Sequence, residues 1–321
     1  MSTDKMLILG VTGSGKGRLA FELAKTIGGE IISIDSMKVY RRMDIGTAKP
    51  PIENRRLIKY HLIDVVEPSE PFSVGAFLDL TRKAIEEIKS RNKPVVAVGG
   101  TAMYIKALLY GMFEGPGTDE QIRSRLKQRV QTEGLDGLYR QLQKIDPVAA
   151  QRIHSNDAKR IIRALEVYEL TGKPISSFQQ QWDCGDSESR ITNHESRTTK
   201  SDWTIIGLRR EKAEESKRIN ARVKKMLDAG LADEVGSLLA EEKPLSKQAA
   251  CAIGYAEVID YLAGKISLED AIELIKKNTR YLAKHQRTWF RSFGNVNWLD
   301  VAPDEPFESV LSRAIAISCG S

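Results

Sequence analysis

Short apolar runs alternate with helical patterns over the first hundred residues of the chain. Apolar residues that recur every three or four positions predict helices from about Lys16 to Ile27 and from Val74 to Arg91. The shorter apolar runs predict buried strands at Met6–Leu9, Glu30–Ile34, His61–Val65 and Pro94–Val98. Apolar strands that alternate with helices are typical of an α/β fold, in which a parallel sheet is covered on both faces.

The pattern changes near Gly115, where the sequence Gly-Pro-Gly interrupts the alternation. From Thr118 to Gly172 the spacing is helical and polar, and no convincing strand occurs. Residues 176–202 are rich in Ser, Thr, Asp and Glu, which indicates a loop. We therefore expect residues 116–202 to form an all-helical insertion that ends in a polar loop.

The strand pattern returns at Trp203–Leu208, and a last short strand is predicted at Asn295–Leu299. Between these two strands, from Glu211 to Phe293, helical spacing dominates. Residues 1–115 and 203–321 are thus expected to form one core with C-terminal helices, interrupted by the insertion.

Composition adds little to this prediction of the fold and the domain organisation. The chain has 321 residues, 41% of them hydrophobic, and 49 Lys and Arg against 43 Asp and Glu give a net charge of +6. This small basic excess fits a polyanionic partner no better than it fits an ordinary soluble protein. The cysteines, Cys184, Cys251 and Cys319, form no metal-binding or disulfide pattern. We expect a cytoplasmic, monomeric protein without a membrane segment.

A phosphate-binding motif follows the first predicted strand. Seven positions of the P-loop pattern are matched between a strand and a helix, by Gly10, Val11, Thr12, Gly13, Ser14, Gly15 and Lys16. Glycines let backbone N–H groups converge on phosphate oxygens, and the following helix adds positive potential. The context makes a chance glycine turn a poor explanation. The core is therefore expected to be a P-loop NTPase-like parallel sheet.

Two features separate this motif from that of an ordinary ATPase or kinase. The eighth position, where Ser or Thr holds a magnesium ion, is Gly17. The strand at 94–98 ends in glycines rather than in a metal-anchoring aspartate. A P-loop binds a phosphate chain but does not name the reaction, so the motif alone leaves the activity open.

A carboxylate follows the second predicted strand. Asp35 lies at its carboxyl end, and in a parallel sheet such ends share one crevice with the phosphate loop. Asp35 would then face whatever the loop holds. The alternative is that Asp35 caps the start of a helix, and local sequence does not decide between the two.

The spacing of several motifs resembles the tRNA dimethylallyltransferase, or tRNA isopentenyltransferase, family. In chain order these motifs are Ile34-Asp35-Ser36-Met37-Lys38-Val39-Tyr40, Met43-Asp44-Ile45-Gly46-Thr47-Ala48-Lys49-Pro50, His61-Leu62-Ile63-Asp64, Val98-Gly99-Gly100-Thr101 with Tyr104, Arg163-Ala164-Leu165-Glu166-Val167, Thr171-Gly172-Lys173-Pro174, Ile253-Gly254-Tyr255 and Thr288-Trp289-Phe290. The resemblance extends from about residue 6 to residue 299.

The resemblance implies transfer of a dimethylallyl group from dimethylallyl diphosphate to N6 of adenosine 37 in tRNA. It implies that Asp35 is the general base, that Lys16 and Arg218 bind the diphosphate, and that Thr101 positions the substrates. It also implies Mg²⁺ as cofactor and an anticodon stem-loop held by the insertion. The RNA contacts that it implies are Asp35, Ser36, Met37, Lys38, Thr101, Arg123, Lys159, Arg160, Ile161, Ile162 and Arg163.

The sequence departs from the family pattern at a few positions. Gly17 replaces the usual Thr or Ser, Cys251 and Ala256 stand where polar or basic residues are usual, and His285 stands where Arg is common. Gly17 keeps open a binding-only homologue with little turnover. Two further alternatives are an adenine-nucleotide prenyltransferase and a small-molecule P-loop kinase. The long insertion argues against the first of these two, and the Gly99-Gly100-Thr101 strand end argues against the second.

Residues 271–293 carry two stripes at helical spacing. An apolar stripe is expected to face the core and consists of Ala271, Ile275, Leu282, Trp289 and Phe293. A basic stripe consists of Lys277, Arg280, Lys284, Arg287 and Arg291. A basic stripe is most often a solvated face, but with tRNA as the expected partner it becomes a candidate for phosphate contacts.

Overall fold

The computed structural model describes residues 4–111, 115–178 and 203–319, and the chain forms two compact units. The larger unit comprises residues 1–109 and 200–321, and the smaller comprises residues 110–199. Most of the polar loop expected at 176–202 lies outside the described residues. No helix in the part of the chain that the structure describes is long and apolar enough to cross a membrane.

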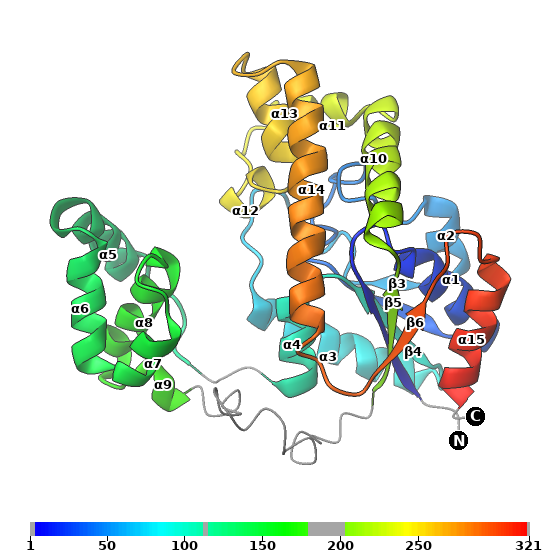
Figure 1. Ribbon diagram of the computed structural model, residues 1–321, viewed down its shortest axis with the longest axis horizontal. Helices are drawn as coiled ribbons and strands as arrows, with labels where there is room; N and C mark the ends of the chain where they lie inside the picture. The colour runs from blue at the N-terminus through cyan, green and yellow to red at the C-terminus, as the bar shows by residue number, and fades with distance from the viewer. Residues whose placement is uncertain (1–3, 112–114, 179–202, 320–321) are drawn as a thin grey trace. The chain divides into compact units, whose positions relative to one another are not determined.

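The larger unit is built on a parallel sheet with the strand order β3-β2-β4-β1-β5-β6 (Figure 1). Its strands are β1 (Lys5–Gly10), β2 (Glu30–Ile34), β3 (Tyr60–His61), β4 (Val95–Gly99), β5 (Thr204–Arg209) and β6 (Val296–Asp300). The order places the carboxyl ends of β1, β2 and β4 side by side, which is where ligands bind in open α/β sheets. The predicted parallel-sheet core is confirmed.

Helices flank the sheet of the larger unit. They are α1 (Lys16–Ile27), α2 (Ile52–Leu57), α3 (Val74–Ser90), α4 (Ala102–Tyr110), α10 (Lys212–Asp228), α11 (Leu231–Leu239), α12 (Lys247–Ala250), α13 (Tyr255–Leu262), α14 (Leu268–Phe290) and α15 (Phe307–Cys319). Side-chain caps fix three of the starts, because the hydroxyls of Ser73, Ser246 and Ser267 accept N–H bonds in the first turns of α3, α12 and α14.

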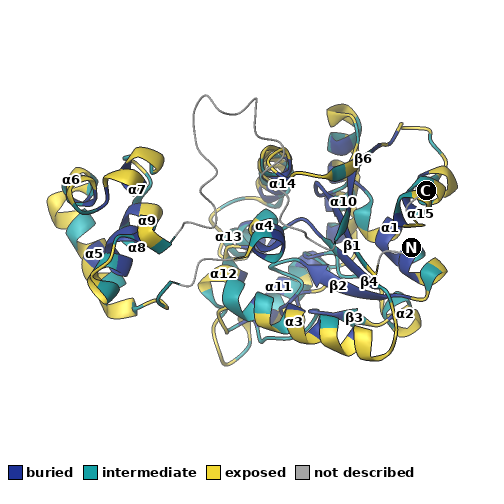
Figure 2. Ribbon diagram, turned by 90° about the horizontal axis from the view of Figure 1, so that it is seen from below, coloured by how far each residue is buried: buried dark blue, intermediate teal, exposed yellow. Residues whose placement is uncertain are grey.

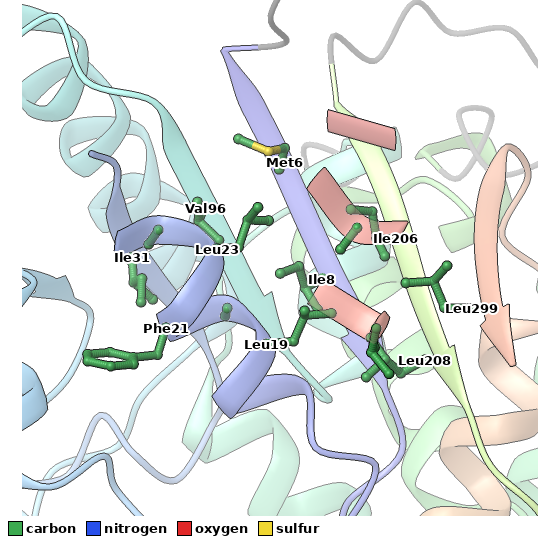
Figure 3. Close-up of a cluster of buried hydrophobic side chains, with 14 of the residues drawn as sticks. Met6, Ile8, Leu19, Phe21, Leu23, Ile31, Val96, Ile206, Leu208 and Leu299 are labelled. Carbon is green, nitrogen blue, oxygen red and sulfur yellow. The ribbon is translucent and has the colours of Figure 1, made fainter. Parts of the chain in front are cut away.

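The core lies on both faces of the sheet, as the burial colours of Figure 2 show. On one face, Met6 and Ile8 of β1 belong to a cluster with Leu19 of α1 and side chains of α15 (Figure 3). Leu7 and Leu9 alternate with them, so they point to the opposite face, and they are equally buried. Coverage of both faces explains why the strands are almost continuously apolar.

The predicted strand at His61–Val65 is wrong beyond its first residue. Only Tyr60 and His61 pair with β2. Leu62 and Asp64 have left-handed backbones, with φ of 61° and 57°, and this conformation ends the strand. Lys49 and Arg55 form ion pairs with the Asp64 carboxylate and hold the turn. The segment 61–65 is as apolar as a strand, but its ion pairs with residues elsewhere in the chain determine its backbone conformation.

The motif at residues 43–50 and the motif at residues 253–255 lie in contact in the structure. Glu234 of α11 accepts hydrogen bonds from the backbone N–H groups of Asp44, Ile45 and Gly46. The hydroxyl of Tyr255 donates to the same carboxylate at 2.6 Å. A Cβ at Gly46 would lie 2.4 Å from the Tyr255 ring, so only glycine permits this packing. Glu234 and Tyr255 therefore hold the segment around Gly46 in place.

The smaller unit is helical throughout its described part. It consists of α5 (Glu120–Glu133), α6 (Leu135–Ile145), α7 (Pro147–Arg152), α8 (Ala158–Thr171) and α9 (Ile175–Phe178). Its core is a separate apolar cluster that includes Leu126, Leu138, Leu142 and Leu165. Asp119, Asp146 and Asp157 cap three of these helices through their carboxylates. The predicted all-helical insertion has its own hydrophobic core.

Candidate active site

The loop between β1 and α1 turns sharply before the start of α1. Gly13 and Gly15 have positive φ angles of 82° and 96°, which let the chain turn toward the start of α1. The amide of Ser14 donates to the carbonyl of Val11 at 3.1 Å and closes the loop. The ammonium group of Lys16 lies 3.2 Å from the same carbonyl oxygen. The loop therefore supplies amides, a helix N-terminus and a mobile cation to one space.

Lys16 lies in a cluster of positive charge around one carboxylate. The pKa of Lys16 is lowered from its ordinary value to about 7, chiefly by burial and also by the charges of Lys38 and Arg222, whereas the charge of Asp35 opposes this shift. Burial also lowers the pKa values of Lys38 and Arg222, and Asp35 opposes the shift for both. Three cations against one carboxylate leave an excess of positive charge that a diphosphate would neutralise.

Asp35 stands at the carboxyl end of β2, as the sequence predicts. Its Oδ1 atom accepts hydrogen bonds from the amides of Met37 at 2.9 Å and Lys38 at 3.2 Å. The segment that follows is a turn and not a helix, so the helix-cap alternative is wrong. Among the described residues no hydrogen bond engages the second carboxylate oxygen, Oδ2. That oxygen remains available to a substrate.

Thr101 links β4 to the turn that carries Asp35. Its Oγ1 atom accepts a hydrogen bond from the amide of Ser36 at 3.1 Å. This approach requires glycine at the end of β4, because a Cβ at Gly99 would lie only 1.9 Å from the carbonyl oxygen of Ile34. The Val-Gly-Gly-Thr motif therefore lets two strand ends converge on Asp35.

These groups line one cavity of about 1060 Å³ that lies within the larger unit. The phosphate loop, Asp35 and Thr101 form its polar wall. Its apolar wall includes Met103, Met226, Ile275, Leu282 and Trp289. A cavity with a cationic end, a carboxylate and an apolar wall can hold a small prenyl diphosphate beside a proton acceptor.

The predicted core-facing stripe of α14 is therefore wrong in part. Ala271 and Ile275 are buried, and Phe293 is buried just beyond the end of the helix. Leu282 is 40% exposed, and Leu282 and Trp289 both line the cavity. Amphipathic spacing marks an apolar face, but it does not distinguish a packed core from the wall of a binding cavity.

Arg218 and Arg222 occupy successive turns of α10 and face the phosphate loop. Arg218, an expected diphosphate ligand, donates from Nε to the carbonyl of Gly13 at 2.7 Å. Arg222, which was not expected at the site, has its NH1 atom 3.4 Å from Oγ1 of Thr12. Both line the cavity, and Arg222 is the one whose charge interacts with Asp35. The spacing of four residues from Arg218 is the signal that points to Arg222.

Gly17 lies in the first turn of α1 and is exposed. A Cβ at this position would meet no atom within 4 Å, so a larger residue fits there. No group of three or more potential metal ligands occurs among the described residues. The acidic residues that line the cavity are Glu22 and Asp35. This donor set suits a magnesium ion held mainly by substrate phosphates and water, with at most one or two protein carboxylates.

The candidate RNA contacts of the smaller unit surround a buried carboxylate. Glu166 is fully buried, forms an ion pair with Nε of Arg123 at 3.0 Å, and accepts hydrogen bonds from NH1 of Arg163 at 2.8 Å and from the amide of Asp119 at 2.7 Å. Arg163 also donates to the carbonyls of Pro116 and Gly117. The two arginines are therefore held in place by the protein, with 29% and 25% of their side chains exposed.

The remaining candidates differ in their access to solvent. Lys159 and Arg160 are exposed at the start of α8. Ile162 is partly buried against the apolar cluster of this unit. Ile161 is fully buried in that cluster, so its side chain is a core residue rather than an RNA contact. The helical spacing explains this result, since Ile161 lies one turn before Leu165 on the face of α8 that belongs to the apolar cluster.

Comparisons with known proteins agree with this geometry. The family model described as IPP transferase matches residues 38–293. The tRNA dimethylallyltransferase of Geobacter metallireducens is 43% identical over 313 residues, which cover 98% of this chain and 97% of the relative. The chain belongs to the IPP transferase family.

Other members of the IPP transferase family agree over similar lengths. The tRNA dimethylallyltransferase of Geobacillus kaustophilus is 43% identical, and the match covers 98% of this chain and 97% of that relative. The full-length tRNA isopentenylpyrophosphate transferase of Bacillus halodurans has a TM-score of 0.68 at 38% identity, with 99% of this chain and 97% of that one covered. A eukaryotic dimethylallyltransferase acting on tRNA has a TM-score of 0.78 at 31% identity, covering 98% of this chain and 78% of that one.

Proposed function

We propose that this protein transfers the dimethylallyl group of dimethylallyl diphosphate to N6 of adenosine 37 in tRNA. Its relatives are named for this transfer to tRNA, and the family resemblance supplies the atom and the position. One structural observation supports the proposal independently of the names of these relatives. A cation-lined phosphate loop, a carboxylate with an unengaged oxygen and an apolar wall meet in a single cavity.

The chemistry follows from where these groups lie. The lone pair of N6 is delocalised into the adenine ring, so the amine is a poor nucleophile until its proton is taken. Asp35 accepts that proton as N6 attacks C1 of the dimethylallyl group. The bond from C1 to the diphosphate oxygen breaks, and its electron pair leaves with the diphosphate. Lys16, Arg222 and the loop amides stabilise the charge that develops on this leaving group.

The RNA substrate requires two further assignments. Adenosine 37 lies in a stacked loop, so it must leave the stack before N6 reaches Asp35. The exposed basic residues Lys159 and Arg160, together with Arg123 and Arg163, are assigned to the anticodon stem-loop. Magnesium would be held chiefly by the diphosphate and would neutralise part of its charge. We place the reaction in the cytoplasm and treat the protein as a monomer.

Transfer RNA from cells that lack this gene tests the assignment in vivo. Mass spectrometry of digested tRNA is expected to show that isopentenyl-adenosine is missing. Expression of the wild-type protein should restore it, whereas expression of Asp35→Asn should restore far less. Isopentenyl-adenosine at normal levels in the deletion strain would contradict the assignment, provided that no second gene of this family is present.

Gly17 leads to a prediction about magnesium. Gly17→Thr is expected to raise the single-turnover rate at limiting magnesium, because its hydroxyl supplies the metal ligand that an ordinary P-loop has. The measurement is the rate of transfer as a function of magnesium concentration.

Gly17→Ala is the matched control for this prediction. Alanine adds the Cβ and the helix stabilisation, up to about 1 kcal/mol, but no hydroxyl. Coincident magnesium curves for the threonine and alanine variants would mean that a hydroxyl at this position plays no part in holding the metal.

The basic stripe of α14 divides into two groups in the structure. Arg280 donates to Asn220 of α10 at 2.9 Å, and Arg287 donates to Glu215 of α10 at 3.0 Å. Lys277, Lys284 and Arg291 are exposed. The first group joins two helices, which leaves the second group as candidates for phosphate contacts.

Neutralising two exposed lysines should therefore weaken tRNA binding. For Lys277→Gln combined with Lys284→Gln, we expect the slope of log affinity against log salt to fall by about one for each RNA phosphate that is no longer neutralised. The matched control combines Lys83→Gln with Lys89→Gln on α3, which removes the same charge from another exposed helix. Equal salt slopes for the wild type and the α14 variant would mean that Lys277 and Lys284 face solvent and do not contact RNA phosphates.

A further inference from the structure

A buried amide side chain joins the two loops that make up the polar wall of the cavity. Gln286 of α14 is 7% exposed and lines the cavity. Its Oε1 atom accepts a hydrogen bond from the amide of Thr12 at 2.8 Å. Its Nε2 atom donates to the carbonyl of Gly100 at 2.8 Å. One side chain is therefore bonded to the loops that follow β1 and β4.

Each of these two hydrogen bonds leads to a group with an assigned role in the reaction. Thr12 belongs to the loop that ends in Lys16. Gly100 precedes Thr101, whose hydroxyl holds the amide of Ser36, next to Asp35. The position of Gln286 thus affects both the diphosphate end of the cavity and the carboxylate that accepts the proton.

The chemistry of the position favours an uncharged amide. Thr12 presents a donor and Gly100 presents an acceptor, so the side chain between them must accept at one atom and donate at the other. A carboxylate accepts but does not donate, and an apolar side chain does neither. Glycine at position 100 leaves room for this contact, because a Cβ there would lie 2.5 Å from Nε2 of Gln286 and the amide would have to shift.

The hydrogen bond from Thr12 to Gln286 uses one of the backbone amides of the phosphate loop. The sequence predicts that the loop as a whole faces the phosphate, but in the structure the amide of Thr12 donates to Gln286. The diphosphate is then left with the amides farther along the loop, toward the start of α1.

We propose that Gln286 is a positioning residue that fixes the phosphate loop and the Thr101 loop relative to each other. The inference rests on the proposed function, since it assigns Lys16 and Asp35 to one transfer reaction. Loss of the bridge would let the diphosphate and the acceptor base shift relative to each other, and misplacement by about 1 Å is enough to slow a reaction roughly a hundredfold.

Two variants separate the two hydrogen bonds. Gln286→Met has a similar length and makes neither bond, whereas Gln286→Glu keeps the acceptor for Thr12 and places a second acceptor against the Gly100 carbonyl. We expect both to lower the single-turnover rate constant at saturating substrates by roughly tenfold to a hundredfold. Their affinity for the anticodon stem-loop should stay at the wild-type level. Thr288→Ala, on the exposed side of the same helix, should match the wild type in both measurements.

The rate constant of a single turnover does not depend on the fraction of molecules that is folded, so it distinguishes positioning from a purely structural role. A wild-type rate constant in Gln286→Met, with only a lower Tm, would overturn the proposal. Calorimetry with inorganic diphosphate tests the bridge without the transfer reaction. We expect weaker diphosphate binding in Gln286→Met, and unchanged binding would also overturn the proposal. A wild-type protein that binds diphosphate but transfers nothing would refute the proposed function and not the bridge.

Discussion

Asp35→Asn is expected to slow the transfer of the dimethylallyl group roughly a hundredfold or more, which is the range for a lost general base. Asparagine retains an oxygen that can accept from the amides of Met37 and Lys38, so the turn should persist. It cannot take up the proton of N6. The measurement is the single-turnover rate with saturating dimethylallyl diphosphate and an anticodon stem-loop.

Two controls make this prediction specific to Asp35. The affinity of Asp35→Asn for the stem-loop should remain close to that of the wild type, which shows that the site is intact. Ser36→Ala alters the next side chain but keeps the backbone amide that donates to Thr101, so it should be far less impaired. A wild-type rate in Asp35→Asn would remove Asp35 from the role of proton acceptor.

Lys16→Ala is expected to lower the transfer rate roughly a hundredfold to a thousandfold, the range for one lost donor to a developing oxyanion. Lys16 projects from the phosphate loop into the cavity, where it would neutralise charge on the leaving diphosphate. The comparison is between single-turnover rates at saturating dimethylallyl diphosphate. A small loss would mean that Arg222 and the loop amides suffice to stabilise the leaving group.

The pKa of Lys16 adds a test by pH. In the free protein this pKa is lowered to about 7, chiefly by burial, so Lys16 loses its charge as the pH rises through 7. Diphosphate binds the charged form, so its affinity is full below pH 7 and should fall above it by up to about one log unit per pH unit. Lys16→Arg keeps its charge at every pH of interest, so its affinity should fall less steeply with pH than that of the wild type. Wild-type affinity that stays flat up to pH 9 would contradict this account of Lys16.

The sequence allowed the core and the chemistry to be predicted where local pattern decides them. The phosphate loop, its helix and the apolar strands β1, β2 and β4 follow from residue types in immediate succession. Asp35 could be placed at the site because parallel strands end at a common edge. The all-helical insertion follows from its spacing and from the absence of strand patterns.

Features that depend on contacts between distant segments could not be predicted. The turn after His61 depends on Lys49 and Arg55 binding Asp64. The role of Gln286 depends on two loops that lie 274 and 186 residues away in the chain. Neither residue type nor periodicity marks such a position, since a glutamine on a helix is usually solvated. The helical pattern of α14 likewise gives no sign that Leu282 and Trp289 line a cavity.

The central claim is that one cavity transfers the prenyl group of a prenyl diphosphate to an adenine amine of RNA. The most direct test is a single-turnover reaction of the purified protein with labelled dimethylallyl diphosphate and an anticodon stem-loop, followed by nuclease digestion and mass spectrometry. We predict that the label appears on N6 of adenosine 37 and that one diphosphate is released for each modified RNA. Unmodified RNA under conditions where both substrates bind, or label on free adenine nucleotides instead, would contradict the claim.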